Sequence, residues 1–134
     1  MLPVAFALLF ASLPSGHSVI GTWINPDRSV AVRTRPCGPG VCGRVVWASA
    51  KAQADARKGG VSRLVGTELL RNYAPVSDGA WEGQVFVPDR GRTFESHMIQ
   101  LNAQALQIDG CVAGGLLCKK QVWRRVAARG RAFG

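Results

Sequence analysis

From Val19 onward the sequence is divided into short extended segments, each closed by residues that favour turns. Residues 29–34 and 79–87 alternate apolar and polar side chains, the period of a strand with one buried face. The chain has 16 glycines and 7 prolines to supply turns. We expect strands over residues 19–24, 29–34, 41–48, 64–70, 79–87, 93–101, 105–111 and 117–126. Such a series of short strands with short links predicts consecutive antiparallel neighbours.

Eight antiparallel strands in an open sheet would leave two unpaired edges. Closing them into an up-and-down barrel removes both edges. The prediction is therefore a single all-β, lipocalin-like barrel, just wide enough to be filled by side chains or to hold one small ligand. Residues 49–63 interrupt the strand pattern and are rich in Ala, Lys, Gln and Asp, so we expect a longer surface loop with a helical turn there, capped by Gly59-Gly60.

The first 18 residues read as an export signal. They contain no charged side chain, and an apolar run over residues 4–13 is followed by Pro14 and by small residues at Gly16 and Ser18. A signal peptide over residues 1–18 is expected, then a barrel domain over 19–126 and a basic, flexible tail over 127–134. The alternative is a buried strand or short helix. Export predicts a periplasmic or secreted protein that does not span the membrane.

Four cysteines remain after the predicted signal, in two closely spaced pairs. In an exported small domain an even number of cysteines indicates disulfide bonds, and three pairings are possible. The local pairing, Cys37 with Cys42 and Cys111 with Cys118, is favoured because each pair brackets a glycine-rich turn. Zinc held by four thiolates is the rival interpretation, and the spacing and the oxidising compartment argue against it.

The basic side chains indicate anionic partners. There are 13 Arg and 4 Lys against 8 acidic residues, which gives a net charge of +9. Nucleic acid would suit that charge, but export redirects it to anionic components of the cell envelope. A basic cluster in the last strand and tail is the candidate contact: Lys119, Lys120, Arg124, Arg125, Arg129 and Arg131.

A Gly-x-Trp motif opens the first expected strand at Gly21-Thr22-Trp23, and two arginines follow Trp123 in the last. In a closed barrel the first and last strands are neighbours, so a guanidinium can lie on the Trp23 indole. Successive side chains alternate across a strand, so only one of Arg124 and Arg125 can do so. This arrangement resembles that of lipocalins.

The chain from about Val19 to Val126 also resembles a family of exported bacterial proteins, the domain-of-unknown-function family numbered 2147. The residues that carry the resemblance are Gly21-Thr22-Trp23, Cys37, Val41, Cys42-Gly43-Arg44-Val45-Val46-Trp47, Asp55, Leu64-Val65-Gly66, Trp81, Gly83, Pro88, Gly91-Arg92-Thr93-Phe94, Gly110-Cys111 and 118–125. The resemblance implies a small lipocalin-like barrel in the periplasm or outside the cell, and it implies no particular activity. Many relatives carry an Asn-Pro-Asp segment where this chain has residues 54–63, which lack that Asn and Pro.

The candidate ligand-binding residues are the aromatic side chains of four strands and the polar residues of the altered segment. The tryptophans would either line a ligand cavity or fill the core, and core filling is favoured because a small barrel must be plugged. The candidates are Trp23, Trp47, Trp81, Trp123, Asp55, Arg63 and Arg125.

Evidence for catalysis is confined to Glu95 and His97, which share a strand face and could exchange a proton with a substrate. A polar pair on a solvated face is the favoured explanation, because no Ser or Cys nucleophile is visibly placed beside them. One histidine with carboxylates scattered along the sequence is too little for a metal site, and no cofactor motif is present. We therefore expect a non-enzymatic binding module for a small or lipidic ligand. The alternative is a structural protein that contacts anionic envelope components.

Overall fold

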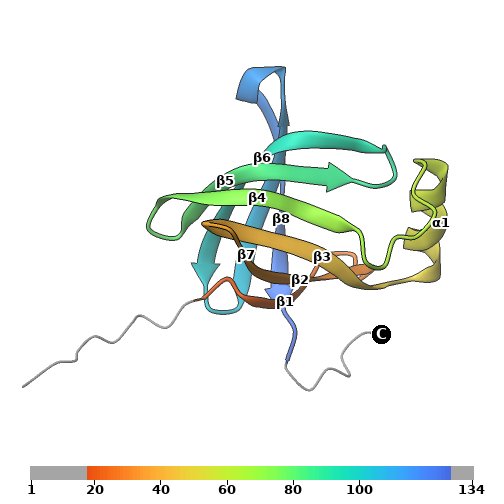
Figure 1. The fold of residues 1–134 in the computed structure, drawn as a ribbon, viewed down its shortest axis with the longest axis horizontal. Helices are drawn as coiled ribbons and strands as arrows, with labels where there is room; N and C mark the ends of the chain where they lie inside the picture. Colours follow the sequence, from red (N-terminus) through yellow and green to blue (C-terminus); the bar gives the residue numbers. More distant parts are fainter. Residues whose placement is uncertain (1–17, 128–134) are drawn as a thin grey trace, which may run out of the picture.

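The computed structural model describes residues 18–127 as a closed barrel of eight antiparallel strands, each paired with its neighbours in sequence, with β1 and β8 closing the ring (Figure 1). The predicted all-β, lipocalin-like architecture is confirmed. The elements are β1 (Gly21–Ile24), β2 (Val30–Cys37), β3 (Gly40–Ala48), α1 (Ala50–Lys58), β4 (Glu68–Ser77), β5 (Ala80–Val87), β6 (Arg92–Asn102), β7 (Ala105–Val112), the 3-10 turn η2 (Ala113–Gly115) and β8 (Leu117–Arg125).

The fourth strand differs from its prediction. It was expected over residues 64–70 and runs instead over Glu68–Ser77. Leu64 is buried in the core, so the sequence around it looks like a strand, yet Leu64 and Thr67 form a turn. The true strand carries Asn72 in a left-handed conformation (φ 51°), where the register with β3 and β5 shifts. A bulge of this kind breaks the two-residue alternation on which the prediction relied.

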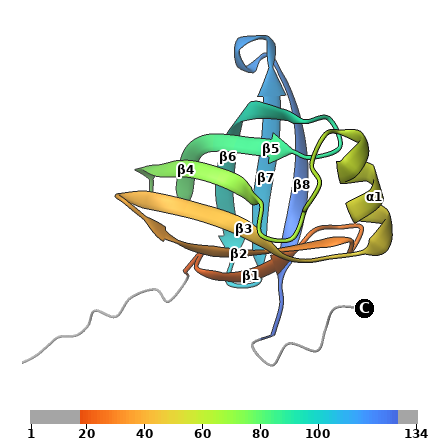
Figure 2. The same ribbon diagram turned by 45° about the vertical axis from the view of Figure 1, so that its right-hand side comes forward.

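The segment between β3 and β4 is more regular than expected, because it contains a nine-residue helix rather than a single turn. Ser49 caps its N-terminus by accepting a hydrogen bond from the Ala52 amide, and Gly59 ends it. Figure 2 shows α1 standing beside the barrel at the end where β5 and β6 meet. A Cβ on Gly59 would lie 2.0 Å from the Pro88 carbonyl oxygen, so the helix end rests directly against the β5–β6 turn.

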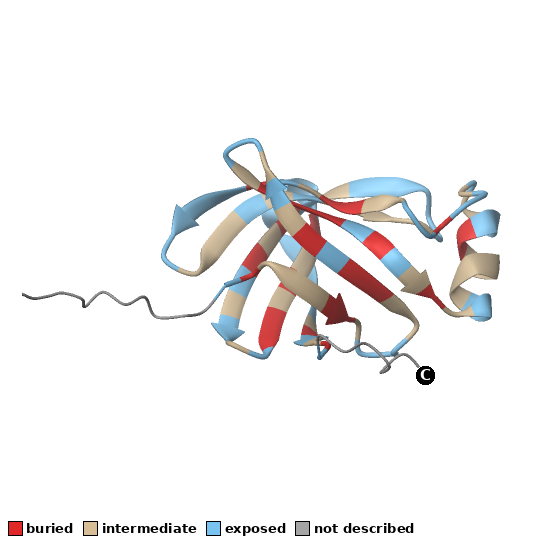
Figure 3. Cartoon of the chain, turned by 60° about the horizontal axis from the view of Figure 1, so that its bottom comes forward, coloured by how far each residue is buried: buried red, intermediate tan, exposed pale blue. Residues whose placement is uncertain are grey.

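The two ends of the barrel are built differently. We call the end with the β2–β3, β4–β5 and β6–β7 turns the closed end, and the other, with α1 and the β1–β2, β5–β6 and β7–β8 turns, the open end. Among the largest fully buried side chains inside the barrel, Trp23, Tyr73, Met98 and Leu106 belong to the closed end and middle. Leu70, also fully buried, is the register partner of Val85 on β5. Figure 3 shows buried residues along the strands and exposed residues at the hairpin tips and on the outer turns of α1.

Trp23 is the centre of the closed end. Its indole nitrogen donates to the carbonyl of Val19 at 3.0 Å, and the Arg125 guanidinium lies 4.4 Å from the ring centroid. Arg125 also donates to the carbonyls of Ile20 and Ala103, so one side chain ties β8 to the N-terminal segment and to the β6–β7 turn. The prediction that one arginine of the pair packs on Trp23 is confirmed, and that arginine is Arg125.

Two disulfide bonds form, Cys37–Cys42 and Cys111–Cys118, which is the local pairing favoured from sequence. The first lies in the β2–β3 hairpin at the closed end, and the second spans β7 and β8 below the open-end hairpin tip. Among residues 18–127, no helix is long and apolar enough to cross a membrane. The predicted signal (1–18, apart from Ser18) and all but the first residue of the predicted tail (127–134) lie outside the described residues.

Candidate functional site at the open end of the barrel

An open pocket of about 1120 Å³ occupies the open end of the barrel. Four parts of the chain surround it: the β1–β2 turn, α1, the β5–β6 turn and the beginning of β8. The pocket is large enough for a ligand of ordinary metabolite or fatty-acid size. It is therefore the candidate binding site of this barrel.

The inner wall of the pocket is apolar. Ile108 and Trp123 are buried at its floor, while Val85, Val87 and Phe94 are only half-buried although they face the interior. These side chains are only partly covered by protein atoms: Val85 packs against the core, and the Arg92 guanidinium lies 5.4 Å from the centroid of the Phe94 ring. The wall thus offers apolar surface that a ligand could cover.

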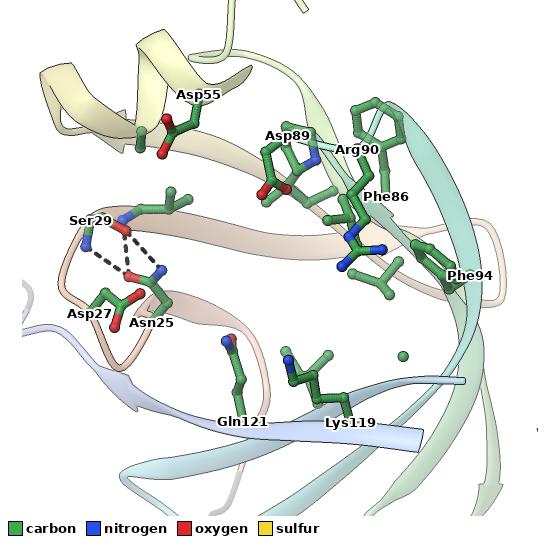
Figure 4. Close-up of a pocket in the computed structure, with 18 of the residues that line it drawn as sticks. Asn25, Asp27, Ser29, Asp55, Phe86, Asp89, Arg90, Phe94, Lys119 and Gln121 are labelled. Carbon is green, nitrogen blue, oxygen red and sulfur yellow. Dashed lines mark hydrogen bonds between the residues drawn. The ribbon is translucent and has the colours of Figure 1, made fainter. Parts of the chain in front are cut away.

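Charged and polar side chains project into the pocket from its rim (Figure 4). Lys119 and Gln121 rise from β8, and they share with Trp123 the face of β8 that looks inward. Arg90 reaches in from the β5–β6 turn beside Phe94. Arg90 and Lys119 make no side-chain ion pair within residues 18–127, so their positive charges are free for a bound group.

Acidic residues also line the rim: Asp27 and Asp55 lie across the pocket from Arg90, and Asp89 lies beside Arg90 in the β5–β6 turn. Asp55 is paired with Lys51, one turn earlier on α1, at 2.8 Å. The hydrogen bond and the charge of the partner raise the pKa of Lys51 and lower that of Asp55. Both therefore stay charged near neutral pH and their charges largely offset each other.

The rim is held in place by local hydrogen bonds and close backbone packing. Asn25 accepts from the amides of Ser29 and Val30 (2.8 and 3.0 Å) and donates to the Ser29 hydroxyl, which fixes the β1–β2 turn (Figure 4). Gly91 has φ +62°, and a Cβ there would lie 2.3 Å from the Gly59 carbonyl oxygen. The β5–β6 turn and α1 therefore approach at a distance that only glycine permits at this position.

The candidate ligand-binding residues named from the sequence lie in different parts of the barrel. Asp55 and Trp123 line the pocket. Trp23 and Arg125 form the closed end, and Trp81 packs against the main core from β5. Trp47 packs with Ile24, Ala31 and Val126 in a separate cluster. Arg63 is exposed and does not line the pocket.

Sequence reasoning missed Arg90, Lys119 and the half-buried wall. Arg90 looks like an ordinary turn residue after Pro88-Asp89, and Lys119 was assigned to a basic surface cluster. The signal that could have found Lys119 was alternation, because it stands four residues before Trp123 on the same strand face. The same alternation divides the predicted basic cluster: Lys119 and Arg125 face inward, whereas Lys120 and Arg124 face outward. Arg129 and Arg131 lie outside the described residues.

The suggested Glu95–His97 pair lies on the outer wall of the barrel. Ser96 and Met98, between and beside them, are buried inside, so Glu95 and His97 face outward. The carboxylates that contact His97 come from neighbouring strands: Asp109, 3.0 Å from Nδ1, and Glu82, 3.7 Å from Nε2. Glu95 makes no ion pair with His97, so the structure does not form the acid–base pair that was weighed from the sequence.

Comparison with known proteins supports the fold. The barrel is similar to a solved structure of the Helicobacter pylori protein HP1028, described as belonging to the lipocalin family, with a TM-score of 0.68, 12% identity, and coverage of 84% of this chain and 86% of that one. No curated protein matches the chain. The family model described as uncharacterized protein conserved in bacteria (DUF2147) matches residues 21–125. The chain therefore belongs to this bacterial family, as the motifs from Gly21 to Arg125 indicated.

Proposed function

We propose that this protein is a non-enzymatic binding module that holds one small amphipathic ligand in the open-end pocket. The observation that carries the proposal is the partly covered inner wall: Val85, Val87 and Phe94 face the barrel interior and remain half-buried. A barrel whose interior was filled for stability alone would bury these positions, as it does at the closed end. The lipocalin-like fold supports the same conclusion.

The distribution of charge favours a ligand with an apolar body and an acidic head. The floor around Ile108 and Trp123 is apolar, whereas Arg90 and Lys119 enter the pocket without carboxylate partners. Burying a carboxylate beside these cations would give charge-assisted hydrogen bonds, which are stronger than neutral ones. A fatty acid or a similar amphipathic acid is the ligand class that matches both features.

The place of action that we propose is the periplasm or the outside of the cell. Disulfide bonds are typical of oxidising compartments and rare in the cytosol, and the apolar run over residues 4–13 reads as an export signal. Mass spectrometry of the protein expressed with its own leader would report cleavage after Ser18. Recovery of an uncleaved chain from the cytoplasm would contradict this part of the proposal.

Binding can be followed through Trp123, the one tryptophan of the four that lines the pocket. We expect dodecanoate to change the tryptophan fluorescence more, and at lower concentration, than dodecanol does. Trp123→Phe should remove the response, whereas Trp47→Phe, on the far side of the wall, should keep it. Arg90→Gln combined with Lys119→Gln should abolish the preference for the acid. Equal responses to both probes, or none, would refute the proposed ligand class.

A second candidate function is attachment to an anionic envelope surface through the β7–β8 tip. Leu116 and Leu117 are 83% and 66% exposed on this tip, the Cys111–Cys118 bond fixes its base, and Lys120 faces outward nearby. Sedimentation with phosphatidylglycerol vesicles, but not with phosphatidylcholine vesicles, would support it. Binding that survives Leu116→Ser with Leu117→Ser would exclude the tip as the contact.

A further inference from the structure

The tip of the β7–β8 hairpin stands out beyond the rest of the barrel at the open end (Figure 1 and Figure 2). Leu116 and Leu117 are the two most exposed large apolar side chains among residues 18–127, and Val112, the register partner of Leu117, is 43% exposed. We call these three residues the apolar tip. Exposed apolar side chains that gather in one place mark a surface of contact.

The apolar tip continues the inner wall of the open-end pocket. Val112 and Leu117 belong to both, because they also line the pocket. Side chains two residues apart share one face of a strand, so the face that carries Leu117 next carries Lys119 and then reaches the floor at Ile108 and Trp123. On this face, Lys119 is the one charged side chain between the tip and the floor, so a largely apolar strip joins them.

The strip runs along a strand that has a neighbour on one side only. β1 pairs with β8 at Arg124 and Arg125 alone. Continuing that register would place Pro26 opposite Val122, but proline has no N–H to donate and the chain turns away there. From Leu117 to Val122, β8 therefore pairs with β7 and with no other described strand. A ligand that moves along β8 between the floor and the tip has no strand of the barrel to displace.

Two lysines follow the apolar tip at a depth that suits a charged membrane surface. Lys119 and Lys120 lie about 7–13 Å along β8 from the tip leucines. Lys120 faces outward, and its register partner Asp109 makes its ion pair with His97 instead. Apolar side chains at an interface sink roughly 5–10 Å below the headgroups, while lysines remain beside anionic headgroups. The order of apolar and basic side chains along the hairpin therefore matches that of an anionic bilayer.

We propose that the apolar tip docks on an anionic lipid bilayer and that the open-end pocket takes up its ligand there by contact, rather than from water. This inference rests on the function proposed above, and it names the lipid surface as the partner that supplies the amphipathic acid. Leu116 and Leu117 enter the acyl region, and Lys120 stays among the headgroups. The acyl chain passes along Val112 and Leu117 to the floor, and Lys119 meets the acid group as it arrives.

Docking can be tested without any ligand through a tryptophan placed at the tip. Leu116→Trp adds a fluorophore at a position that does not line the pocket. Phosphatidylglycerol vesicles with brominated acyl chains should quench the added fluorescence, and phosphatidylcholine vesicles with the same chains should quench it much less. Leu101→Trp is the matched control, because Leu101 is 49% exposed beside the closed-end β6–β7 turn, and it should not be quenched. Equal quenching of the two variants, or by the two lipids, would overturn the docking.

Loading by contact can be tested through its reverse, the release of an anthroyloxy-labelled palmitate from the protein to vesicles that contain a quencher lipid. The stopped-flow rate should rise in proportion to the concentration of phosphatidylglycerol vesicles. Leu116→Asp should make the rate independent of that concentration, as diffusion through water requires, whereas Leu101→Asp should keep the dependence. Neither residue lines the pocket, so the affinity for the palmitate without vesicles should be unchanged in both variants.

The outcomes separate this inference from the proposed function. A release rate that does not depend on vesicle concentration in the unaltered protein would overturn loading by contact and leave the pocket ligand in place. Failure of the palmitate to bind without vesicles would refute the proposed function, and the loading with it. Analytical ultracentrifugation should find a monomer, because pairing two tips would bring the lysines of both copies together. A dimer that Leu116→Asp dissociates would assign the tip to a second copy and overturn the proposal.

Discussion

The two ends of the barrel are made from the same eight strands, but their inward-facing side chains differ in burial. At the closed end, Trp23 and Tyr73 are 1% and 0% exposed, and the Arg125 guanidinium packs over the Trp23 ring. At the open end, Val85, Val87 and Phe94 occupy equivalent inward positions and stay half-buried. The comparison teaches that inward orientation alone does not produce burial. Close packing by neighbouring side chains is also needed, and over the open-end wall that packing is incomplete.

Replacing Trp23 should produce the largest effect. Trp23→Ala removes a fully buried indole, its hydrogen bond to Val19 and the Arg125 stack, and should lower the free energy of unfolding by about 3–5 kcal/mol. Phe94→Ala, on the pocket wall, should lower it much less. Urea unfolding of both variants with intact disulfides would measure the difference. Equal losses would mean that the open end is packed as tightly as the closed end.

Substituting two inward-facing glycines, Gly83 and Gly110, tests the difference in packing between the core and the pocket wall more closely. A Cβ on Gly83 would lie 2.7–2.8 Å from atoms of Arg71 and Tyr73, whereas one on Gly110 would meet Val85 and Phe94 at 3.5 and 3.8 Å. Gly83→Ala should therefore cost about 1–3 kcal/mol of stability through overpacking, and Gly110→Ala should be nearly neutral. Thermal unfolding followed by circular dichroism tests this. A destabilised Gly110→Ala variant would argue against free space beside the pocket wall.

Each end of the barrel has one disulfide bond, so removing them one at a time gives another comparison of the two ends. Each closes a short loop, with sequence separations of 5 and 7, so loss of either should lower stability by about 2 kcal/mol. We expect the Cys111→Ser/Cys118→Ser variant, but not the Cys37→Ser/Cys42→Ser variant, to speed amide hydrogen exchange in the β7–β8 tip. Exchange measured by mass spectrometry distinguishes them. Faster tip exchange in both variants would show that the two ends are not independent.

Replacing Tyr73 should have the smallest effect on the free energy of unfolding at neutral pH, but it should change how that free energy depends on pH. It is the single tyrosine of the chain, it is buried, and it donates to the Ser96 hydroxyl at 2.6 Å. Burial raises the pKa of Tyr73 far above its ordinary value of about 10. The folded state therefore keeps the proton, and the contribution to stability is complete below the unfolded pKa and lost as pH rises above it.

Above pH 10 the free energy of unfolding should fall by about 1.4 kcal/mol per pH unit from this group alone. Tyr73→Phe should cost about 1 kcal/mol at pH 7, from the lost hydrogen bond, and should flatten that alkaline decline. Tyrosinate absorbance near 295 nm should appear only as the native protein unfolds. Tyrosinate formation in the folded protein near pH 10 would contradict the buried position.

Much of the barrel could be predicted from the sequence because its signals are local. Alternation located most strands, short links implied antiparallel neighbours, and Trp23 with the Arg124-Arg125 pair predicted where the ring closes. The fourth strand was misplaced because Asn72 introduces a bulge and Leu64 is buried outside a strand. Local alternation carries no information about either feature.

The sequence by itself indicated the fold class and the family and favoured the local disulfide pairing, because strand alternation, short links and the two cysteine pairs are patterns that can be read along the chain. Only the tertiary structure decided which inward positions are covered and which carboxylates surround His97. Those features depend on strand register, which places Glu82 opposite His97 and Gly110 opposite Lys119. Register follows from the summed packing of the whole barrel, so side chains far apart in sequence meet only when the ring has closed.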